Sequence, residues 1–319
     1  MTGERVDTET LGLPETPGFT DVDAALHAGE GTVAIVGEPF AGRATVLDHL
    51  AERAETTRHS LDPGADAPDI PDSGTLVVDD CQQLYTRRVG GFDPLDAFLV
   101  AVARSDGLVV TGWNAFSWAY LTRSRAVKPA FDAVVRLPDL DAGALAAHLD
   151  GDVEFIANPN DRLPAVVRGE WTPRVAGRSL SVPYPRINRD WLTHVRTNEG
   201  DPRDAVFERL AAESRGNPGV ARAIWERSVR EGRLAPAWVD AGVESPELDT
   251  IEAFTLRVVL AKELATRGEL DAVTGRREVG GVLRALVRQG LVERTETGYA
   301  PTPAGLPTAA RAVDRRRIP

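Results

Sequence analysis

The chain has 319 residues, 42% of them hydrophobic and 27% charged, which is enough apolar material for about two globular domains. Its formal net charge of −11 argues against broad electrostatic binding to nucleic acid. The lone Cys81 excludes an internal disulfide, and no apolar run approaches the roughly 18 residues that a membrane helix requires. We therefore expect a cytoplasmic protein without a membrane span.

The basic residues are unevenly chosen. Only Lys128 and Lys262 are lysines among the 37 basic residues, and acidic residues are in excess. This composition suits a salt-saturated cytosol, as in a halophilic archaeon, because hydrated carboxylates keep a surface soluble there. A GC-rich genome that favours arginine codons is the alternative explanation.

Residues 1–20 are polar, with proline and glycine, and we expect them to form a flexible arm. The next segment, 21–140, carries the strongest motif. Residues 31–48 (GTVAIVGEPFAGRATVLD) have the pattern of a strand, a glycine-bounded loop and a helix. The loop matches the spacing of a P-loop, G-x-x-x-x-G-K-[ST], whose backbone N–H groups wrap a polyphosphate at a helix N-terminus. The predicted nucleotide-binding residues here are Gly37, Glu38, Pro39, Phe40, Ala41, Gly42, Arg43, Ala44 and Thr45.

Two chemical positions of this loop depart from the P-loop pattern. Arg43 stands where the lysine should be, and Ala44 stands where a hydroxyl should hold Mg²⁺. Arginine is broad and planar, whereas lysine is a compact point charge, so the exchange is not conservative. Three interpretations follow: a slow ATPase, a nucleotide binder without turnover, or a pseudo-ATPase.

Residues 75–80 (TLVVDD) have the Walker B pattern of a buried strand that ends in two acids. The carboxyl edge of such a strand is where ligands bind in open α/β sheets. In such sites Asp79 would hold Mg²⁺, and Asp80 would polarise the attacking water as the catalytic residue. A strand followed by an aspartate-rich turn is the alternative.

Further strands are predicted at 58–61, 107–111 and 131–137, alternating with helices such as 93–104. This alternation predicts an α/β fold with a parallel sheet built from right-handed βαβ units. The strand at 107–111 leads into Asn114, whose side chain could face a ligand at the sheet edge. Asn114 could equally serve as a helix cap.

Residues 141–235 have the pattern of a helical lid, interrupted at about 152–190 by an insertion of irregular loops or a β-hairpin. The sequence RGNPGVAR at 215–222 places a glycine- and proline-rich turn between two helices. Ordinary turn chemistry also explains this turn. A linker at 232–248 follows.

From residue 249 to 319 the order is three helices, a two-stranded hairpin and a last helix, which is typical of a winged helix-turn-helix domain. Such a domain can read DNA through its third helix and wing. The exposed candidates for DNA contact are Arg277, Arg284, Arg288 and Arg294. Acidic neighbours at positions 278, 293 and 296 dilute the positive charge, and a winged helix can instead pack on a lid or bind protein.

Taken together, these motifs and their order resemble the AAA+/STAND superfamily of P-loop ATPases, which includes replication-initiator-like ATPases and regulatory switches. The resemblance covers all but the arm and the insertion. It implies binding of ATP and Mg²⁺, a sensor role for Asn114, a nucleotide-base contact for Pro218 and a second sensor role for Arg222.

The sequence therefore supports two hypotheses. The first is an ATP-binding regulatory protein with a winged-helix output domain and weak or absent hydrolysis. The second is a pseudo-ATPase scaffold or DNA-binding transcriptional regulator that has lost the nucleotide. DNA, another protein or a second copy of the chain are the macromolecular partners that the pattern allows. The histidines lack the spacing of a metal site.

Overall fold

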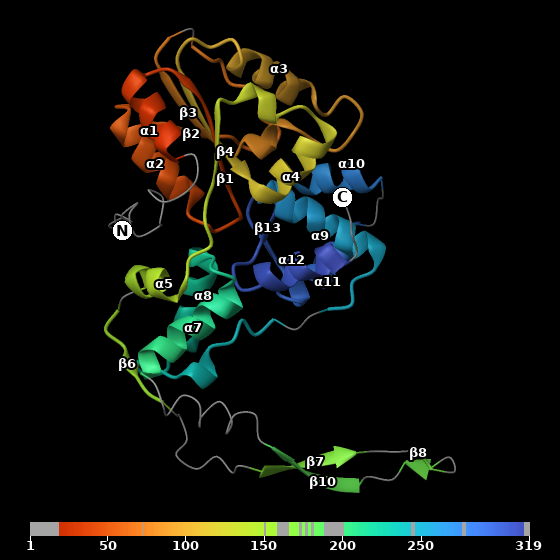
Figure 1. The fold of residues 1–319 in the computed structure, drawn as a ribbon. Coiled ribbons are helices and arrows are strands. Elements are labelled where there is room, and N and C mark those ends of the chain that lie inside the picture. Colours follow the sequence, from red (N-terminus) through yellow and green to blue (C-terminus); the bar gives the residue numbers. More distant parts are fainter. Residues whose placement is uncertain are drawn as a thin grey trace.

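The computed structural model describes residues 19–71, 73–149, 151–157, 201–243, 246–275 and 279–315, and the backbone of four short strands between 166 and 187. Residues 1–18 of the predicted arm, Arg277 and residues 316–319 lie outside the described residues, whereas residues 19 and 20 of that arm begin a helix. Figure 1 shows a sheet with helices on both faces, joined to two helical groups.

The core is a five-stranded parallel sheet with strand order β2-β3-β4-β1-β5. Its strands are β1 (Gly31–Gly37), β2 (Arg58–Ser60), β3 (Thr75–Asp79), β4 (Leu108–Asn114) and β5 (Ala133–Arg136). All four pairings are parallel, so the carboxyl ends of the strands lie at one edge. β1 and β4 are mostly apolar and almost wholly buried because helices cover both faces of the sheet. The predicted α/β fold class is confirmed.

Two apolar clusters flank the sheet. On one face, α3 (Asp93–Val102) and α4 (Ala115–Ser124) bury an aromatic group that includes Trp113, Trp118 and Phe131. On the other face, α1 (Phe19–Ala28) and α2 (Arg43–Arg53) pack on β1 through residues such as Val46 and Leu47. The short 3-10 helices η2 (Cys81–Leu84) and η3 (Lys128–Ala130) complete this part of the chain.

The second group of helices lies in the segment predicted as a lid and is here called the lid. It comprises α5 (Ala142–His148), α7 (Pro202–Ser214) and α8 (Pro218–Ser228), and the turn before α8 is called the lid turn. Phe207 of α7 stacks on Trp225 of α8, with ring centroids 5.4 Å apart. Short strands β6 (Glu154–Phe155) and β11 (Arg233–Leu234) pair in parallel, and the 3-10 helix η4 (Pro236–Trp238) follows. The insertion contains the antiparallel pair β7 (Val166–Trp171) and β10 (Val182–Ile187), with a smaller pair, β8 (Arg174–Val175) and β9 (Arg178–Ser179), between them.

The third group, here called the C-terminal unit, comprises residues 246–275 and 279–315. It contains α9 (Thr250–Lys262), α10 (Arg267–Thr274), α11 (Val279–Arg288), the hairpin β12 (Val292–Arg294) and β13 (Tyr299–Pro301), and α12 (Leu306–Arg315). An Asp249 and Glu252 capping box begins α9 and satisfies its first N–H groups.

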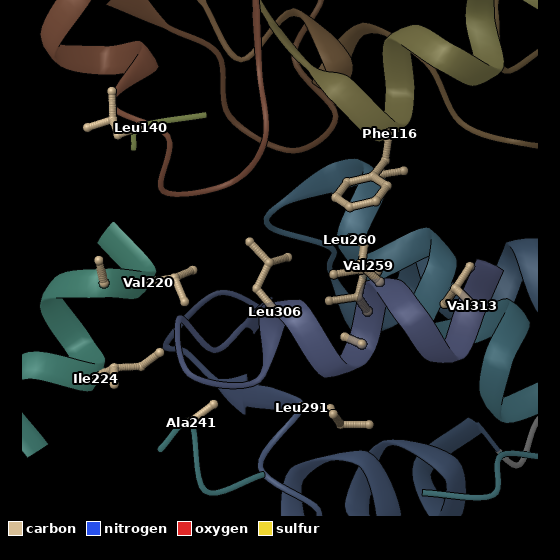
Figure 2. Packing of buried hydrophobic residues seen from close by; sticks show 14 of the residues in the cluster. Phe116, Leu140, Val220, Ile224, Ala241, Val259, Leu260, Leu291, Leu306 and Val313 are labelled. Carbon is tan, nitrogen blue, oxygen red and sulfur yellow. The ribbon is translucent and has the colours of Figure 1, made fainter. Parts of the chain in front are cut away.

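The C-terminal unit packs on the rest of the protein through a continuous apolar cluster. Phe116 of α4 points onto α9 near Val259 and Leu260, and Leu306 of α12 faces the region of α8 (Figure 2). Residues of the segment expected to be a linker, including Leu234, Val239 and Ala241, belong to the same cluster. The C-terminal unit is therefore docked on the core and lid by buried apolar side chains.

A substitution at Gly112 of β4 tests the packing at the carboxyl edge of the sheet. A Cβ at this position would clash with Asp79 Oδ1 and lie 2.6 Å from Leu47 Cδ1. Both neighbours are buried, so we expect Gly112→Ala to lower the free energy of unfolding by about 1–3 kcal/mol. Chemical denaturation would measure it. The matched control is Gly281→Ala in α11, where a Cβ meets nothing within 4 Å. If Gly112→Ala lowers the free energy of unfolding no more than Gly281→Ala does, the packing described here is wrong.

Candidate phosphate-binding site and its internal ion pairs

The sequence motifs meet at the carboxyl edge of the sheet. Gly37 at the end of β1 pairs in register with Asn114 at the end of β4, and Asp79 ends the neighbouring β3. The edge where these strands end is the usual ligand position in an open α/β sheet. The fold thus brings together the residues predicted from three separate stretches of sequence.

The predicted P-loop connects β1 to α2 as a tight turn. Ala41 N donates to Glu38 O, Phe40 has φ of 67°, and Gly42 has φ of 87°. Glycine adopts such a φ without steric cost, which explains its place immediately before the helix. No side chain caps the N-terminus of α2, and its first turn contains no acid. The helix itself therefore supplies no acidic side chain to the positive end of its dipole.

Arg43, at the lysine position of the motif, does not extend along the loop toward a ligand. Its side chain is only 6% exposed and is enclosed by three carboxylates. Nε lies 2.7 Å from Asp79 Oδ1, and Nη2 lies 2.8 Å from Asp80 Oδ1. Nη1 lies 2.6 Å from Glu263 Oε1, and Nη2 lies 3.2 Å from Glu263 Oε2. Although burial disfavours its charge, Glu263 and Asp79 raise the pKa of Arg43.

The two Walker B acids are held by further donors. Asp79 Oδ1 accepts from the Asp80 backbone N–H, and Arg58 Nη1 lies 3.3 Å from Asp79 Oδ2. Asp80 accepts from Ser60 Oγ and from Gln82 Nε2. Burial raises the pKa of Asp80, and the Asp79 and Glu263 carboxylates add to the rise while Arg43 opposes it. Asp80 also has φ of 59°, a strained value for a residue with a side chain.

This donor set does not fit a Mg²⁺ ion. Both oxygens of Asp79 face guanidinium groups, the side chain is 2% exposed, and Ala44 offers no hydroxyl. Octahedral Mg²⁺ needs oxygen ligands with room for several waters. Within the described residues, no group of three or more acids, histidines or cysteines is arranged to hold a metal. In this arrangement the acids are engaged by arginine and do not form a site for a hydrolytic Mg²⁺.

Asn114 caps a helix, which is one of the roles considered from sequence, and it also contacts Glu263. Its Oδ1 accepts from the N–H groups of Phe116 and Ser117 and so caps α4. Its Nδ2 donates to Glu263 Oε1 at 2.8 Å and to the Leu260 carbonyl at 2.9 Å. The amide thus faces the site, where it contacts the same carboxylate as Arg43.

The lid turn contacts the P-loop directly. Asn217 Nδ2 donates to the Pro39 carbonyl at 2.8 Å, and Gly219 N donates to the Phe40 carbonyl at 3.1 Å. A Cβ at Gly219 would lie 2.7 Å from the Phe40 Cβ, so only glycine permits this approach. Pro218 is buried in the first turn of α8, whereas Arg222 is exposed on that helix.

The end of α9 is docked on the core beside these residues. Lys262 is 3% exposed, and its Nζ donates to the carbonyls of Gln82 and Tyr85 and pairs with Glu269. Burial lowers the pKa of Lys262 to about 8, against the opposing effect of Glu269. In return, Gln83 Nε2 donates to the carbonyls of Lys262 and Leu264.

Three of the residues predicted to contact DNA are exposed on the C-terminal unit. Arg284 and Arg288 are exposed on α11, and Arg294 is exposed at the end of β12. Arg277 lies outside the described residues. Acidic Glu293 and Glu296 are exposed on the same hairpin.

Sequence reasoning missed the partners that come from distant segments. Glu263 lies 220 residues from Arg43 along the chain, and no motif spacing connects them. The resemblance pointed to Pro218, whereas the contact with the P-loop is made by the neighbouring Asn217. Lys262 carried one usable signal in the sequence, because it is one of only two lysines in the chain. The structure shows that it is buried, and a buried lysine is almost always paired.

A central parallel strand, a glycine-bounded turn into a helix, and acids from a strand two places along the sheet define an α/β P-loop NTPase fold. No family model matches the chain, and no curated protein matches it.

Among solved structures, the chain is similar to the RuvB Holliday junction branch migration motor of Thermotoga maritima, at 16% identity and a TM-score of 0.38, covering 98% of this chain and 96% of that one. It is similar to Cdc6p from Pyrobaculum aerophilum, at 12% identity and a TM-score of 0.37, covering 99% and 96%. It is also similar to the ADP form of Aeropyrum pernix ORC2, at 10% identity and a TM-score of 0.38, covering 99% and 95%.

The raised pKa of Asp80 gives a test by pH. A carboxyl whose pKa is higher in the folded than in the unfolded state binds its proton more tightly when folded. Acidification from neutral pH toward about 4 should therefore stabilise wild type relative to Asp80→Asn, which cannot titrate. Thermal melts of both proteins between pH 7 and 4 would measure the difference. Asp66→Asn, an exposed change in the loop before β3, is the control. A wild-type protein that loses stability relative to Asp80→Asn over this range would contradict the assignment.

Proposed function

We propose that this protein is a nucleotide-responsive regulatory protein of the AAA+/STAND type. In this proposal the P-loop binds the polyphosphate of ATP, the lid turn closes over it, and the C-terminal unit is a winged-helix output domain. Hydrolysis is weak or absent. The observation that carries the proposal is the glycine-bounded turn between β1 and α2, which Asn217 and Gly219 of the lid turn contact directly.

The shape of the loop supports nucleotide binding. A glycine-bounded turn leads into an α2 N-terminus without a side-chain cap, which is a favourable place for a phosphate. The lid turn reaches this loop through Asn217 and Gly219, so a ligand at the loop would alter contacts with the lid. The contact of Pro218 with the nucleotide base and the second sensor role of Arg222, which is exposed on α8, belong to this proposal.

The chemistry of the acids supports weak or absent turnover. Phosphoryl transfer depends mainly on positioning and on cations that neutralise developing charge. Arg43 is committed to Asp79 and Asp80, and position 44 lacks the hydroxyl that would ligate Mg²⁺. Binding and conformational signalling fit this site better than hydrolysis.

The order of elements in the C-terminal unit supports a winged-helix output. Three helices and a hairpin are followed by α12, and exposed Arg284, Arg288 and Arg294 lie on α11 and β12. DNA, another protein and a second copy of the chain are the partners that this pattern allows, since acidic residues lie beside these arginines.

A pseudo-ATPase scaffold or DNA-binding regulator is the second candidate. The observation in its favour is that Asp79, Asp80 and Glu263 satisfy Arg43 without any ligand. A site whose charges pair internally needs no nucleotide to be stable.

The variant Ala44→Asp tests nucleotide binding while preserving the fold. Ala44 is exposed in the first turn of α2, where an aspartate favours the helix but repels a phosphate. We expect ATP, with and without Mg²⁺ in molar KCl, to bind the protein and to lose at least tenfold in affinity with this variant, as measured by calorimetry. At 100 times the dissociation constant, ATP should stabilise the native state by about 2.7 kcal/mol.

The matched control is Ala126→Asp, which adds the same charge at an exposed position before η3. Equal affinities for Ala44→Asp and Ala126→Asp would place the nucleotide elsewhere. Absence of ATP binding by folded wild type and also by folded Glu263→Ala would establish the second candidate instead.

A further inference from the structure

The carboxylate of Glu263 lies where an anion would be recognised at this edge of the sheet. Its two oxygens accept from Arg43 Nη1 at 2.6 Å and Nη2 at 3.2 Å. Oε1 also accepts from Asn114 Nδ2 at 2.8 Å. A planar guanidinium that donates two hydrogen bonds recognises carboxylates and phosphates through the same geometry.

The donors to Glu263 come from the positions at which the sequence places contacts with a phosphate. Arg43 occupies the lysine position of the P-loop, and Asn114 ends the strand beside that loop. Glu263 itself comes from the end of α9, far away in sequence. The end of α9 therefore supplies a carboxylate to Arg43 and Asn114, the two side chains that would otherwise contact a bound phosphate.

The backbone around Glu263 is held in place by the core. The carbonyls of Leu260, Ala261 and Lys262 at the end of α9 accept from Asn114, Ser117 and Gln83, in that order. These are carbonyls that a helix terminus leaves without partners of its own.

Glu263 has φ of 58° and ψ of −40°, an unfavourable conformation for a residue with a Cβ. Such a conformation persists only where surrounding contacts enforce it. The position of the carboxylate is thus part of the docking of α9 and is not a chance surface contact.

We propose that Glu263 is an internal substitute for a phosphate group, and that a nucleotide polyphosphate and the C-terminal unit compete for Arg43 and Asn114. This proposal rests on the proposed function, because it assumes that the P-loop accepts a polyphosphate. A phosphate beside Glu263 would add a fourth anion to the three carboxylates that already surround Arg43, and like charges at this distance repel. Nucleotide binding therefore withdraws Glu263 and loosens the end of α9 from the core.

The proposal assigns a direction to the regulation. The ligand-free protein is the state in which the C-terminal unit is docked, and the nucleotide releases it. Arg43 would exchange one anionic partner for another, so its burial never leaves it without a counter-charge.

The experiment compares wild type, Glu263→Ala and Glu263→Gln with a charge-matched control, Glu296→Ala. Glu296 is exposed on the hairpin of the same unit, so its loss removes one negative charge without touching the site. Calorimetry with ATP, ADP and tripolyphosphate, each without Mg²⁺, measures affinity. Hydrogen exchange of residues 256–266 and 81–86 measures docking separately.

We expect Glu263→Ala to bind ATP about tenfold or more tightly than wild type and Glu296→Ala. Glu263→Gln should fall between them because it keeps a hydrogen-bond acceptor but loses the charge. ATP should speed exchange in residues 256–266 of wild type by tenfold or more, and Glu263→Ala should show faster exchange there before any ligand is added.

Two results would overturn the proposal, and they differ. If wild type and Glu263→Ala bind ATP equally and exchange at α9 does not respond, nucleotide binding stands but the competition is wrong. If no folded variant binds any of the three ligands, the proposed function fails and the competition fails with it, whatever the exchange shows.

Discussion

The structure depends on how a buried guanidinium is compensated. Arg43 is almost fully removed from water, and an isolated buried charge is strongly unfavourable unless it is paired and hydrogen-bonded. Its three carboxylate partners come from the end of β3 and from the end of α9. This one side chain therefore connects the loop after β1, the acidic edge of the sheet and the C-terminal unit. Loss of Arg43 would leave these carboxylates crowded together without their shared counter-charge, a more costly change than replacing the whole group by apolar residues.

The balance of charge in this group is not neutral. Asp79, Asp80 and Glu263 face Arg43, and Arg58 approaches Asp79 from the side while it pairs with Asp48. The effect of this excess negative charge is seen at Asp80, because burial and the neighbouring carboxylates raise its pKa. The strained φ of Asp80 and of Glu263 places two unfavourable backbone conformations beside the same ion pairs. Stored strain and unbalanced charge at one edge are features of sites that change state.

Local sequence patterns predicted the strands and helices whose formation depends on the apolar residues within each segment. Continuous apolar runs gave β1, β3, β4 and β5, and periodic apolar positions gave the helices of the lid and of the C-terminal unit. The acids after β3 and the loop before α2 were placed correctly at one edge because parallel strands end together. Local patterns could not predict the ion pairs of Arg43, because one of its partners is Glu263, which reaches the site only through the docking of α9. The stretch at 232–248 has a linker's composition, but its few apolar residues, such as Leu234 and Val239, are buried.

The two departures from the P-loop pattern have one physical explanation. A lysine ammonium is a compact charge that suits a bridge between phosphates, whereas an arginine fork can address several carboxylates at once. Here Nε, Nη1 and Nη2 each have a different carboxylate oxygen as nearest partner. With the acids engaged in this way, a hydroxyl at position 44 would have no Mg²⁺ to hold, so alanine is sufficient there. Gly112 is part of the same arrangement, because a Cβ at this position of β4 would clash with Asp79 Oδ1, the oxygen that Arg43 contacts. Arginine, alanine and glycine thus form a consistent set in which an internal ion pair replaces the lysine–phosphate and hydroxyl–metal contacts of the motif.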